Sequence, residues 1–350
     1  MRSESQPALA LPPAFVDEAT AARWLRRAVT LPAYLLLAIL IVAALPVLLP
    51  MAVVFDLVRR SNFATARAGA MLIAYLLCEA AGIIAAGALQ LVAALLGFAD
   101  DRRLALHYRL QHYWAGALFG AARRLYALRL ALSGDEDGDG GPLLVFIRHA
   151  SLADTLLPSQ VVARRHGYRL RYVLKRELLY DACLDLVGNR LPNVFVRRAS
   201  GDSAKEIDAI RRLATDLGRH EGVLIYPEGT RFSASKRERA LARIAATQPA
   251  RLAAARGLQH LLPPHLGGPL ALLDAAPRAD VLFVAHTGLE SAATLGDLWR
   301  GAMIGRTVRV HLRRVPRSTI PTTRAERAAW LDAEWAKLDA VIDAGLRTED

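Results

Sequence analysis

The chain has 350 residues, of which 53% are hydrophobic, and it carries a formal net charge of +12. This length provides a sizeable core in one large domain or two smaller ones, and the apolar fraction, with a positive mean hydropathy, indicates a membrane component. The two cysteines, Cys78 and Cys183, lie far apart in the chain, which argues against a disulfide framework and fits a reducing compartment.

The positive charge does not by itself indicate a nucleic-acid-binding protein. Arginines are spread along the whole chain, and no helix-turn-helix, zinc-finger or aromatic-sheet pattern accompanies them. Lysine occurs only at Lys175, Lys205, Lys236 and Lys337. A cationic surface that faces anionic lipid, or an acidic cofactor or carrier, accounts for the charge at least as well.

After an N-terminal segment, residues 1–27, the pattern predicts a hydrophobic helical hairpin over residues 28–99. Residues 28–55 contain no charged side chain, and residues 68–99 are interrupted only by one glutamate and one glutamine. Each run exceeds the ~20 apolar residues that are needed to cross a bilayer. The first run also starts too late, and is too long, for a cleaved signal peptide.

Arginines flank both apolar runs and leave two membrane arrangements open. They are Arg23, Arg26 and Arg27 before the first run, Arg59, Arg60 and Arg67 between the runs, and Arg102 and Arg103 after the second. A hairpin that crosses twice would place the middle cluster outside, against the positive-inside tendency. A re-entrant or interfacial hairpin, kinked by Pro46 and Pro50, would keep all three clusters on one side.

Residues 100–132 continue as a basic, aromatic-rich segment that is expected to be helical from Leu104 to Leu132. It either lies in the membrane interface, where aromatic rings settle, or covers the next domain as an ordinary helix. The polar, glycine-rich residues 133–141 then indicate a linker to a domain over residues 142–350.

Short apolar runs alternate with helical stretches after the linker, which predicts an α/β fold with a mixed sheet flanked by helices. The expected strands are Leu143–Ile147, Leu170–Leu174, Val194–Val196, Val223–Tyr226, Val281–Ala285 and Val308–Arg313. The expected helices include Leu152–Arg165, Ser203–Leu217 and an amphipathic C-terminal helix at Thr323–Gly345.

The stretch FIRHASLADTLLP, residues 146–158, brings a histidine and an aspartate to the carboxyl end of an expected strand, where α/β domains gather their chemistry. Histidine can take a proton near neutral pH, and a carboxylate can fix its tautomer. Residues five apart do not face each other on a regular helix, so His149 and Asp154 can pair only if His149 precedes the helix. As an alternative, Asp154 caps the helix through a capping box that begins at Ser151, and His149 is structural.

A second stretch, VLIYPEGTRF at residues 223–232, is a strand that ends in Glu228, Gly229, Thr230 and Arg231. Glycine permits a tight turn, while Thr230 and Arg231 offer donors suited to a phosphate, which arginine can bind through two nitrogens. Taken alone, the stretch is also compatible with a loop that has no function. Its presence together with the histidine motif favours a catalytic site.

With these two stretches the chain resembles the glycerolipid acyltransferases related to 1-acylglycerol-3-phosphate acyltransferase. HASLAD is similar to the H-x4-D motif of the family, and YPEGTRF to its EGTR motif. VLKRELLY and NVFVRR resemble its lysine-rich strand end and its second motif, which aligns Lys175 and Arg198 with family positions. HLLPPHLGG, residues 260–268, is similar to a segment of the branch that contains the lysophosphatidate and lysocardiolipin acyltransferases of eukaryotes.

Two departures accompany this resemblance, which spans residues 143–290. Arg148 stands where the family usually has asparagine before the histidine, and a weaker match around Pro263 replaces the usual valine–proline fourth motif. The hydrophobic hairpin before the domain matches the layout of the family.

The resemblance implies an enzyme that moves an acyl group from a thioester, on coenzyme A or acyl carrier protein, to the free hydroxyl of a lysophospholipid. It implies that His149 is the general base and that Asp154 orients it, with no covalent enzyme intermediate. Arg231, Arg198 and Lys175 would bind the phosphate of the acceptor. The expected acceptor is lysophosphatidate, which gives phosphatidate, and another lysophospholipid is the main alternative because residues 260–268 resemble the remodelling branch.

The remaining motif residues have supporting roles by the same resemblance. Gly229 would let the chain turn closely around the phosphate next to Thr230, and Glu228 would organise the site. The histidines show no ligand spacing, so no metal is implied, and no cofactor is expected beyond acyl-CoA or acyl carrier protein as co-substrate.

The expected partners are membrane lipids, the lysophospholipid acceptor and the acyl donor, and no nucleic acid. The expected location is the bacterial inner membrane, with the catalytic domain on its cytoplasmic side. A membrane-tethered protein that holds lipid without catalysis is a further alternative, and the presence of His149, Asp154, Glu228 and Arg231 argues against it.

Overall fold

The computed structural model describes residues 15–16, 18–134, 140–196, 204–292 and 294–347. Within these residues, the centre of the molecule is an eight-stranded sheet with the strand order β1-β5-β4-β6-β3-β7-β8-β2. Neighbouring strands are parallel except β7 and β8, which are antiparallel, so the predicted mixed sheet is confirmed. The strands are β1 Phe15–Val16, β2 Arg129–Gly134, β3 Leu143–Ile147, β4 Arg169–Lys175, β5 Val194–Val196, β6 Glu221–Ile225, β7 Asp280–Thr287 and β8 Thr307–Val315.

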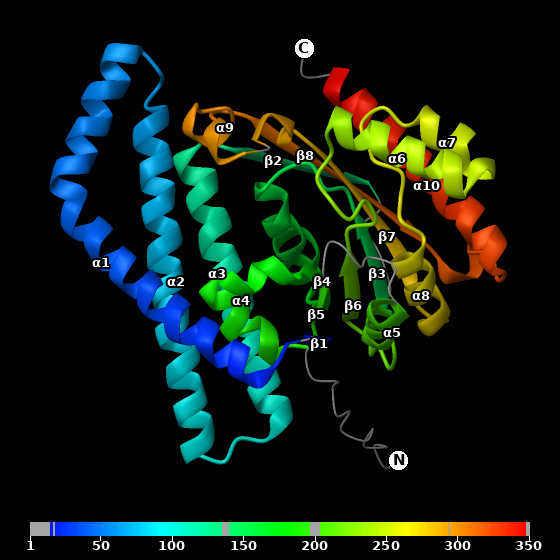
Figure 1. Ribbon diagram of the computed structural model, residues 1–350, viewed down its shortest axis with the longest axis horizontal. Helices are drawn as coiled ribbons and strands as arrows, with labels where there is room; N and C mark the ends of the chain where they lie inside the picture. The colour runs from blue at the N-terminus through cyan, green and yellow to red at the C-terminus, as the bar shows by residue number, and fades with distance from the viewer. Residues whose placement is uncertain (1–14, 17, 135–139, 197–203, 293, 348–350) are drawn as a thin grey trace.

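Helices cover both faces of this sheet (Figure 1). They are α1 Thr20–Arg59, α2 Ala64–Leu95, α3 Asp100–Leu125, α4 Ala182–Leu186, α5 Ala204–Leu213, α6 Ala234–Thr247, α7 Leu252–Gly257, α8 Gly267–Ala275, α9 Leu295–Trp299 and α10 Arg324–Arg347. Short 3-10 turns lie at Ala153–Leu156, Arg176–Tyr180, Gly188–Arg190, Pro249–Arg251, Glu290–Ala292 and Arg317–Thr319, and a π-helical turn at Ser159–Arg164.

Side chains along a strand alternate between the two faces of the sheet, and each face has its own buried cluster. Leu144 and Phe146 of β3 pack with α5, α8 and α10. Val145 and Ile147 of the same strand face the other way and pack with α3 and with the turns that follow β3. Because both faces of β3 are buried, the loop that follows it emerges from the buried centre of the sheet.

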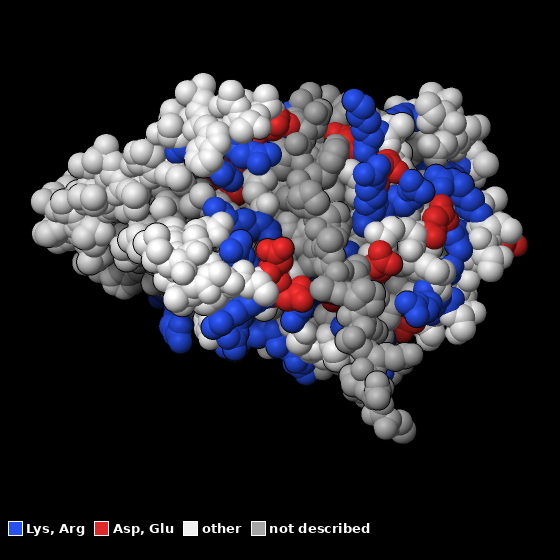
Figure 2. All heavy atoms as spheres, turned by 90° about the horizontal axis from the view of Figure 1, so that it is seen from below, with Lys and Arg blue, Asp and Glu red and all other residues white. Residues whose placement is uncertain are grey.

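The helices α1 and α2 form the predicted hydrophobic hairpin, which lies outside α3 in Figure 1. Both are long and apolar enough to cross a membrane, and only 6% and 28% of their most apolar windows are buried. Figure 2 shows the end of the molecule formed by the hairpin as almost devoid of charged side chains. An exposed apolar surface of this extent marks an interaction surface rather than a solvated one.

Buried polar contacts attach the hairpin to the sheet domain. Asp185 of α4 lies 2.7 Å from Arg26 and 2.9 Å from Arg27, both on α1. The hydroxyl of Tyr75 on α2 donates to Asp181 at 2.8 Å. A flexible tether makes no such contacts, so the hairpin is part of the folded unit.

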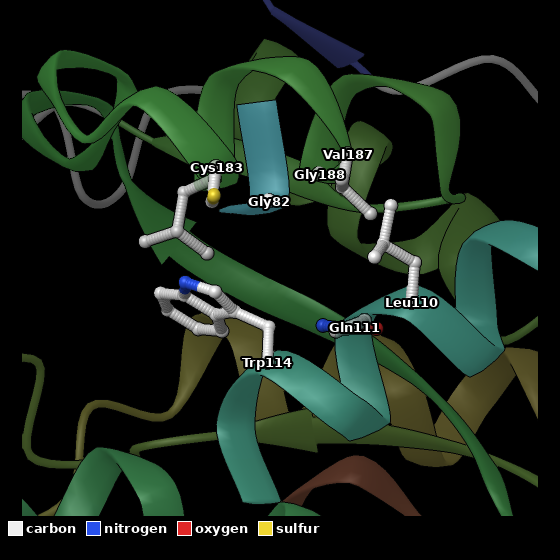
Figure 3. Close-up of a pocket in the computed structure, with 8 residues that line it drawn as sticks. Gly82, Leu110, Gln111, Trp114, Cys183, Val187 and Gly188 are labelled. Atoms are coloured by element: carbon white, nitrogen blue, oxygen red, sulfur yellow. The ribbon is translucent and has the colours of Figure 1, made fainter. Parts of the chain in front are cut away.

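The junction between α2, α3 and α4 adds a second set of contacts beside a pocket, and Figure 3 shows the residues that line this pocket, among them Gly82, Trp114 and Cys183. Glu79 of α2 accepts hydrogen bonds from the indole of Trp114 at 2.8 Å and from the backbone N–H of Cys183 at 2.9 Å. Gly82 faces Cys183 so closely that a Cβ there would lie 2.3 Å from its sulfur. Both cysteines, Cys78 and Cys183, are free thiols.

Several predicted boundaries are corrected by the structure. The helix expected to reach Leu132 ends at Leu125, and residues 129–134 form the edge strand β2, which pairs in parallel with β8. The sheet therefore includes two strands, β1 and β2, that precede the predicted linker, of which residues 135–139 lie outside the described residues. The helix expected at Leu152–Arg165 is a 3-10 turn followed by a π-helical turn.

Candidate active site

Three loops meet at one edge of the sheet, after β3, β6 and β7. Phe146 of β3 lies opposite Ile225 of β6 on one side and Phe283 of β7 on the other. Because parallel strands end at the same edge, the residues that follow these three strands come together there.

His149 lies in the turn directly after β3, before the helical turns, as its pairing with Asp154 requires. Its Nδ1 is 3.0 Å from Oδ1 and 3.3 Å from Oδ2 of Asp154. The ring of Tyr226 lies beside it, with the two centroids 4.6 Å apart. Asp154 is wholly buried, whereas His149 retains 8% exposure. With Nδ1 held by the carboxylate, Nε2 is the ring nitrogen that can exchange a proton with a substrate.

The carboxylate of Asp154 also organises the backbone of the turn. It accepts hydrogen bonds from the N–H groups of Ala150 at 2.6 Å and Ser151 at 2.7 Å. Capping and pairing with histidine are therefore not alternatives here, because one carboxylate does both. Burial by itself raises the pKa of Asp154, but hydrogen bonds from His149 and His286 outweigh burial and hold this pKa well below its ordinary value.

Glu228 joins three segments of the site through its two carboxylate oxygens. Oε1 accepts from the backbone N–H of His149 at 2.8 Å, and Oε2 accepts from that of Leu262 at 2.9 Å. Burial raises the pKa of Glu228 to about 8, although these two N–H groups act in the opposite direction. Glu228 thus fixes the turn that carries His149 to the segment that follows α7.

The loop after β6 turns sharply at Gly229, whose φ of 65° lies in the left-handed region. A Cβ at this position would also lie 3.2 Å from the ring of His265. Glycine is therefore favoured there by conformation, and the space for a side chain is tight.

The rest of this loop is attached to the histidine turn and to α6. The N–H of Phe232 donates to the carbonyl oxygen of His149 at 3.0 Å. Lys236 of α6 donates to the hydroxyl of Thr230 at 3.0 Å and to the carbonyl oxygen of Arg231 at 2.9 Å. Thr230 and Arg231 are thus held next to the candidate base.

Two other residues, Lys175 and Arg198, were predicted to bind the phosphate. Lys175 is the last residue of β4 and lies at the same edge of the sheet, but β6 separates its strand from β3. Arg198 lies outside the described residues. The roles predicted for both remain predictions.

The structure adds a group that the sequence analysis did not assign. His286, near the end of β7, lies 3.5 Å from Asp154 through its Nε2. Arg148, one of the two departures from the family pattern, is buried and donates to the carbonyl oxygen of His286 and to the carboxylate of Glu290. A polar residue near the end of an apolar strand was the available signal, but its pairing with β3 is not visible in the sequence.

Comparison with known proteins agrees with the motifs. Residues 129–263 match the family model described as Acyltransferase. The chain has no match among curated proteins. Among solved structures it is similar to the 1-acyl-sn-glycerophosphate (LPA) acyltransferase PlsC from Thermotoga maritima, with 13% identity and a TM-score of 0.39, over 77% of this chain and 97% of that one. The matched residues contain both the H-x4-D and the EGTR motif, so residues 129–263 form an acyltransferase domain.

Proposed function

We propose that this enzyme is membrane-bound and transfers an acyl group from an acyl thioester to the free hydroxyl of a lysophospholipid, with lysophosphatidate as the first candidate acceptor. The observation that carries the proposal is the buried His149–Asp154 pair, which lies next to the loop that bears Arg231.

In the proposed mechanism His149 acts as a general base. Nε2 of His149 takes the proton of the acceptor hydroxyl while its oxygen attacks the thioester carbonyl carbon, and Asp154 stabilises the imidazolium that forms. The tetrahedral intermediate collapses, the carbon–sulfur bond breaks, and the thiolate takes the proton back from His149. The products are an ester and a free thiol, and no metal or cofactor is assigned.

The acceptor phosphate is assigned to the loop after β6. Arg231 can bind two phosphate oxygens at once, and the tight turn at Gly229 allows the backbone to approach the ligand closely. Lys236 contacts this loop through Thr230 and through the carbonyl oxygen of Arg231, which supports a fixed loop geometry. Lys175 and Arg198 are proposed as further cations of the same site.

Location at a membrane is proposed from the hairpin. The apolar surfaces of α1 and α2 are largely unburied within the molecule, and burying them in lipid is strongly favourable. Since Asp185 and Asp181 attach both helices to the sheet domain, such burial would hold the site at the surface where lysolipids reside.

A panel assay tests this proposal. The full-length protein in detergent is given lysophosphatidate, lysophosphatidylcholine, lysophosphatidylglycerol and lysocardiolipin, each with acyl-CoA and with acyl carrier protein as donor. We expect ester formation with lysophosphatidate and weaker or no transfer to acceptors without a terminal phosphate. Transfer to none of the acceptors with either donor would refute the proposal.

A second acceptor class is favoured by one observation. Residues 260–268, which resemble the remodelling branch, pack on the candidate site. The backbone N–H of Leu262 donates to the carboxylate of Glu228, and the N–H of His265 donates to the carbonyl oxygen of Pro227 at 2.9 Å. Preference for a lysophospholipid with a larger headgroup over lysophosphatidate would select this alternative.

A further inference from the structure

We propose that His286 is a positioning residue for the reaction: its Nε2–H group donates to Oδ2 of Asp154, the carboxylate oxygen farther from Nδ1 of His149, and keeps the carboxylate aimed at the base. This inference rests on the proposed function. It assigns a role to a buried histidine that neither the H-x4-D motif nor the EGTR motif includes.

The geometry of His286 fits a donor and not an acceptor. Its Nε2 faces the carbonyl oxygen of Arg148 at 3.3 Å and Oδ2 of Asp154 at 3.5 Å, and both of these atoms are acceptors. Its Nδ1 is buried and has no hydrogen-bond partner in the described part of the chain. A neutral ring with its proton on Nε2 satisfies this environment, whereas a doubly protonated ring would bury an unpaired N–H.

His286 is held firmly enough to serve this purpose. It is 1% exposed and lies within β7, next to the strand that leads to His149. Arg148 donates to its carbonyl oxygen and pairs with Glu290, while Glu290 accepts from the N–H of Gly288 at 2.8 Å.

A further hydrogen bond joins the same two loops. The hydroxyl of Ser151 donates to the carbonyl oxygen of Ala292 at 2.9 Å. The loop after β7 is thereby attached to the turn that carries His149, and Arg148 is part of this attachment.

The two oxygens of Asp154 have different surroundings. Oδ1 is the nearer oxygen to His149, whereas Oδ2 lies near the N–H groups of Ala150 and Ser151 and near His286. Without the donor group of His286, more of the negative charge of Asp154 acts on the His149 imidazolium. The carboxylate of Asp154 also gains freedom to rotate.

Other titratable groups lie around this pair and stay unchanged in the experiment. In the described residues they are Arg148 from the β3 loop, Glu228 and Tyr226 from the β6 loop, and Glu290 from the β7 loop.

The test compares His286→Leu, His286→Asn and His286→Gln in the full-length protein. The amide nitrogen of glutamine reaches about as far as Nε2, whereas that of asparagine reaches only as far as Nδ1. We expect His286→Leu and His286→Asn to lower kcat about tenfold, the worth of one hydrogen bond to a charged group, with the KM for the acceptor unchanged. The acid limb of the kcat/KM profile should move to higher pH in both variants. His286→Gln should restore the wild-type kcat and the wild-type position of the acid limb.

The matched control is His311→Leu. His311 lies opposite Ala285 on the neighbouring strand β8, and its Nδ1 contacts Ser133 rather than the site, so kcat and the pH profile should not change. If His286→Leu does not fold, the comparison of His286→Asn with His286→Gln tests the role of His286. Both variants bury an amide, and they differ in how far the amide nitrogen reaches.

Equal kcat and an unmoved acid limb in the asparagine and glutamine variants would overturn the role of His286 while leaving the proposed function intact. Absence of acyl transfer by the wild-type protein would overturn the proposed function, and the inference with it.

Discussion

One carboxylate performs two tasks in the candidate site. Asp154 holds the backbone of the turn through Ala150 and Ser151, and it orients His149 through Nδ1. The hydrogen bonds that keep its pKa low come from His149 in this turn and from His286 of β7. This coupling explains how residues five apart in the sequence can pair at the start of a helical segment.

The phosphate assignment predicts a change in acceptor binding. Arg231→Lys keeps the charge but loses the two-pronged geometry, so the KM for a phosphate-bearing acceptor should rise about ten- to hundredfold, with a smaller change in kcat. Initial-rate kinetics with each substrate varied in turn provide the measurement. Arg239→Lys on the exposed part of α6 is the control and should behave as the wild type. A rise confined to the KM of the acyl donor would contradict the assignment of Arg231.

The buried Glu228 predicts a stability profile that depends on pH. Its pKa is about 8 in the folded protein, above the ordinary value of 4.5, so the folded state holds a proton that the unfolded chain has lost at intermediate pH. The free energy of unfolding should therefore fall as pH rises from about 5 to about 8, and this fall should be reduced in Glu228→Gln. Melting temperatures of both proteins in detergent, from about pH 5 to about pH 8, measure this fall in stability. Parallel profiles for the two proteins would show that Glu228 does not retain its proton.

At the scale of single elements, α2 depends on a small residue where it meets α4. A Cβ at Gly82 would lie 2.3 Å from the sulfur of Cys183, whereas one at Gly87 on the same helix would meet nothing within 4 Å. Gly82→Ala should lower stability by about 1–3 kcal/mol, the usual cost of overpacking, even though alanine favours the helix. Gly87→Ala should be neutral or slightly stabilising.

Melting of the two variants under the same detergent conditions measures this difference. Equal melting temperatures would mean that α2 and α4 are not in contact as described.

The sequence predicted elements well where local pattern determines them. The core strands, the hairpin and the C-terminal helix lie close to their expected positions, because a buried strand or an apolar helix has a continuous signature. The edge strand β2 was predicted as a continuation of the preceding helix. Its partner β8 lies far along the chain, and a half-exposed edge strand has only a weak local pattern.

The residues of the candidate site also divide into those that local sequence pattern predicts and one that it does not. His149, Asp154, Glu228 and Arg231 were named from two motifs that follow strands β3 and β6. The contact of His286 with Asp154 depends on which strand lies beside β3, and this is a property of the assembled sheet.

At the scale of the whole molecule, the apolar hairpin and the site form one body. Both helices contact α4, and α3 lies between the hairpin and the sheet. Figure 2 shows that charged side chains are spread over the visible face of the rest of the molecule and are almost absent from the projecting end that the hairpin forms. This distribution fits a protein that is partly immersed in lipid.

Removal from membranes should therefore require detergent. High salt or alkaline carbonate should not release the protein, because burial of the apolar surfaces of α1 and α2 outweighs surface charge attraction. Fractionation after each treatment, followed by immunoblotting, provides the measurement. Release by salt alone would contradict the proposed membrane burial.

Truncation tests whether the hairpin is more than an anchor. A fragment that starts near Gly141 lacks the hairpin, α3 and the edge strand β2, so it should aggregate or lose most activity, whereas the detergent-solubilised full chain should keep it. A fragment from Asp100 restores α3 and β2 but still lacks the hairpin and the short edge strand β1, so it separates loss of α3 and β2 from loss of the hairpin together with β1. A soluble, fully active fragment from Gly141 would show that the hairpin serves only as an anchor.

The central claim is that His149 is the general base of an acyl transfer, and the most direct measurement is the turnover of His149→Ala in the full-length enzyme. We expect kcat to fall by roughly a hundred- to ten-thousandfold, with an unchanged melting temperature and unchanged acceptor binding. Near-normal acyl transfer by a folded His149→Ala protein would contradict the account.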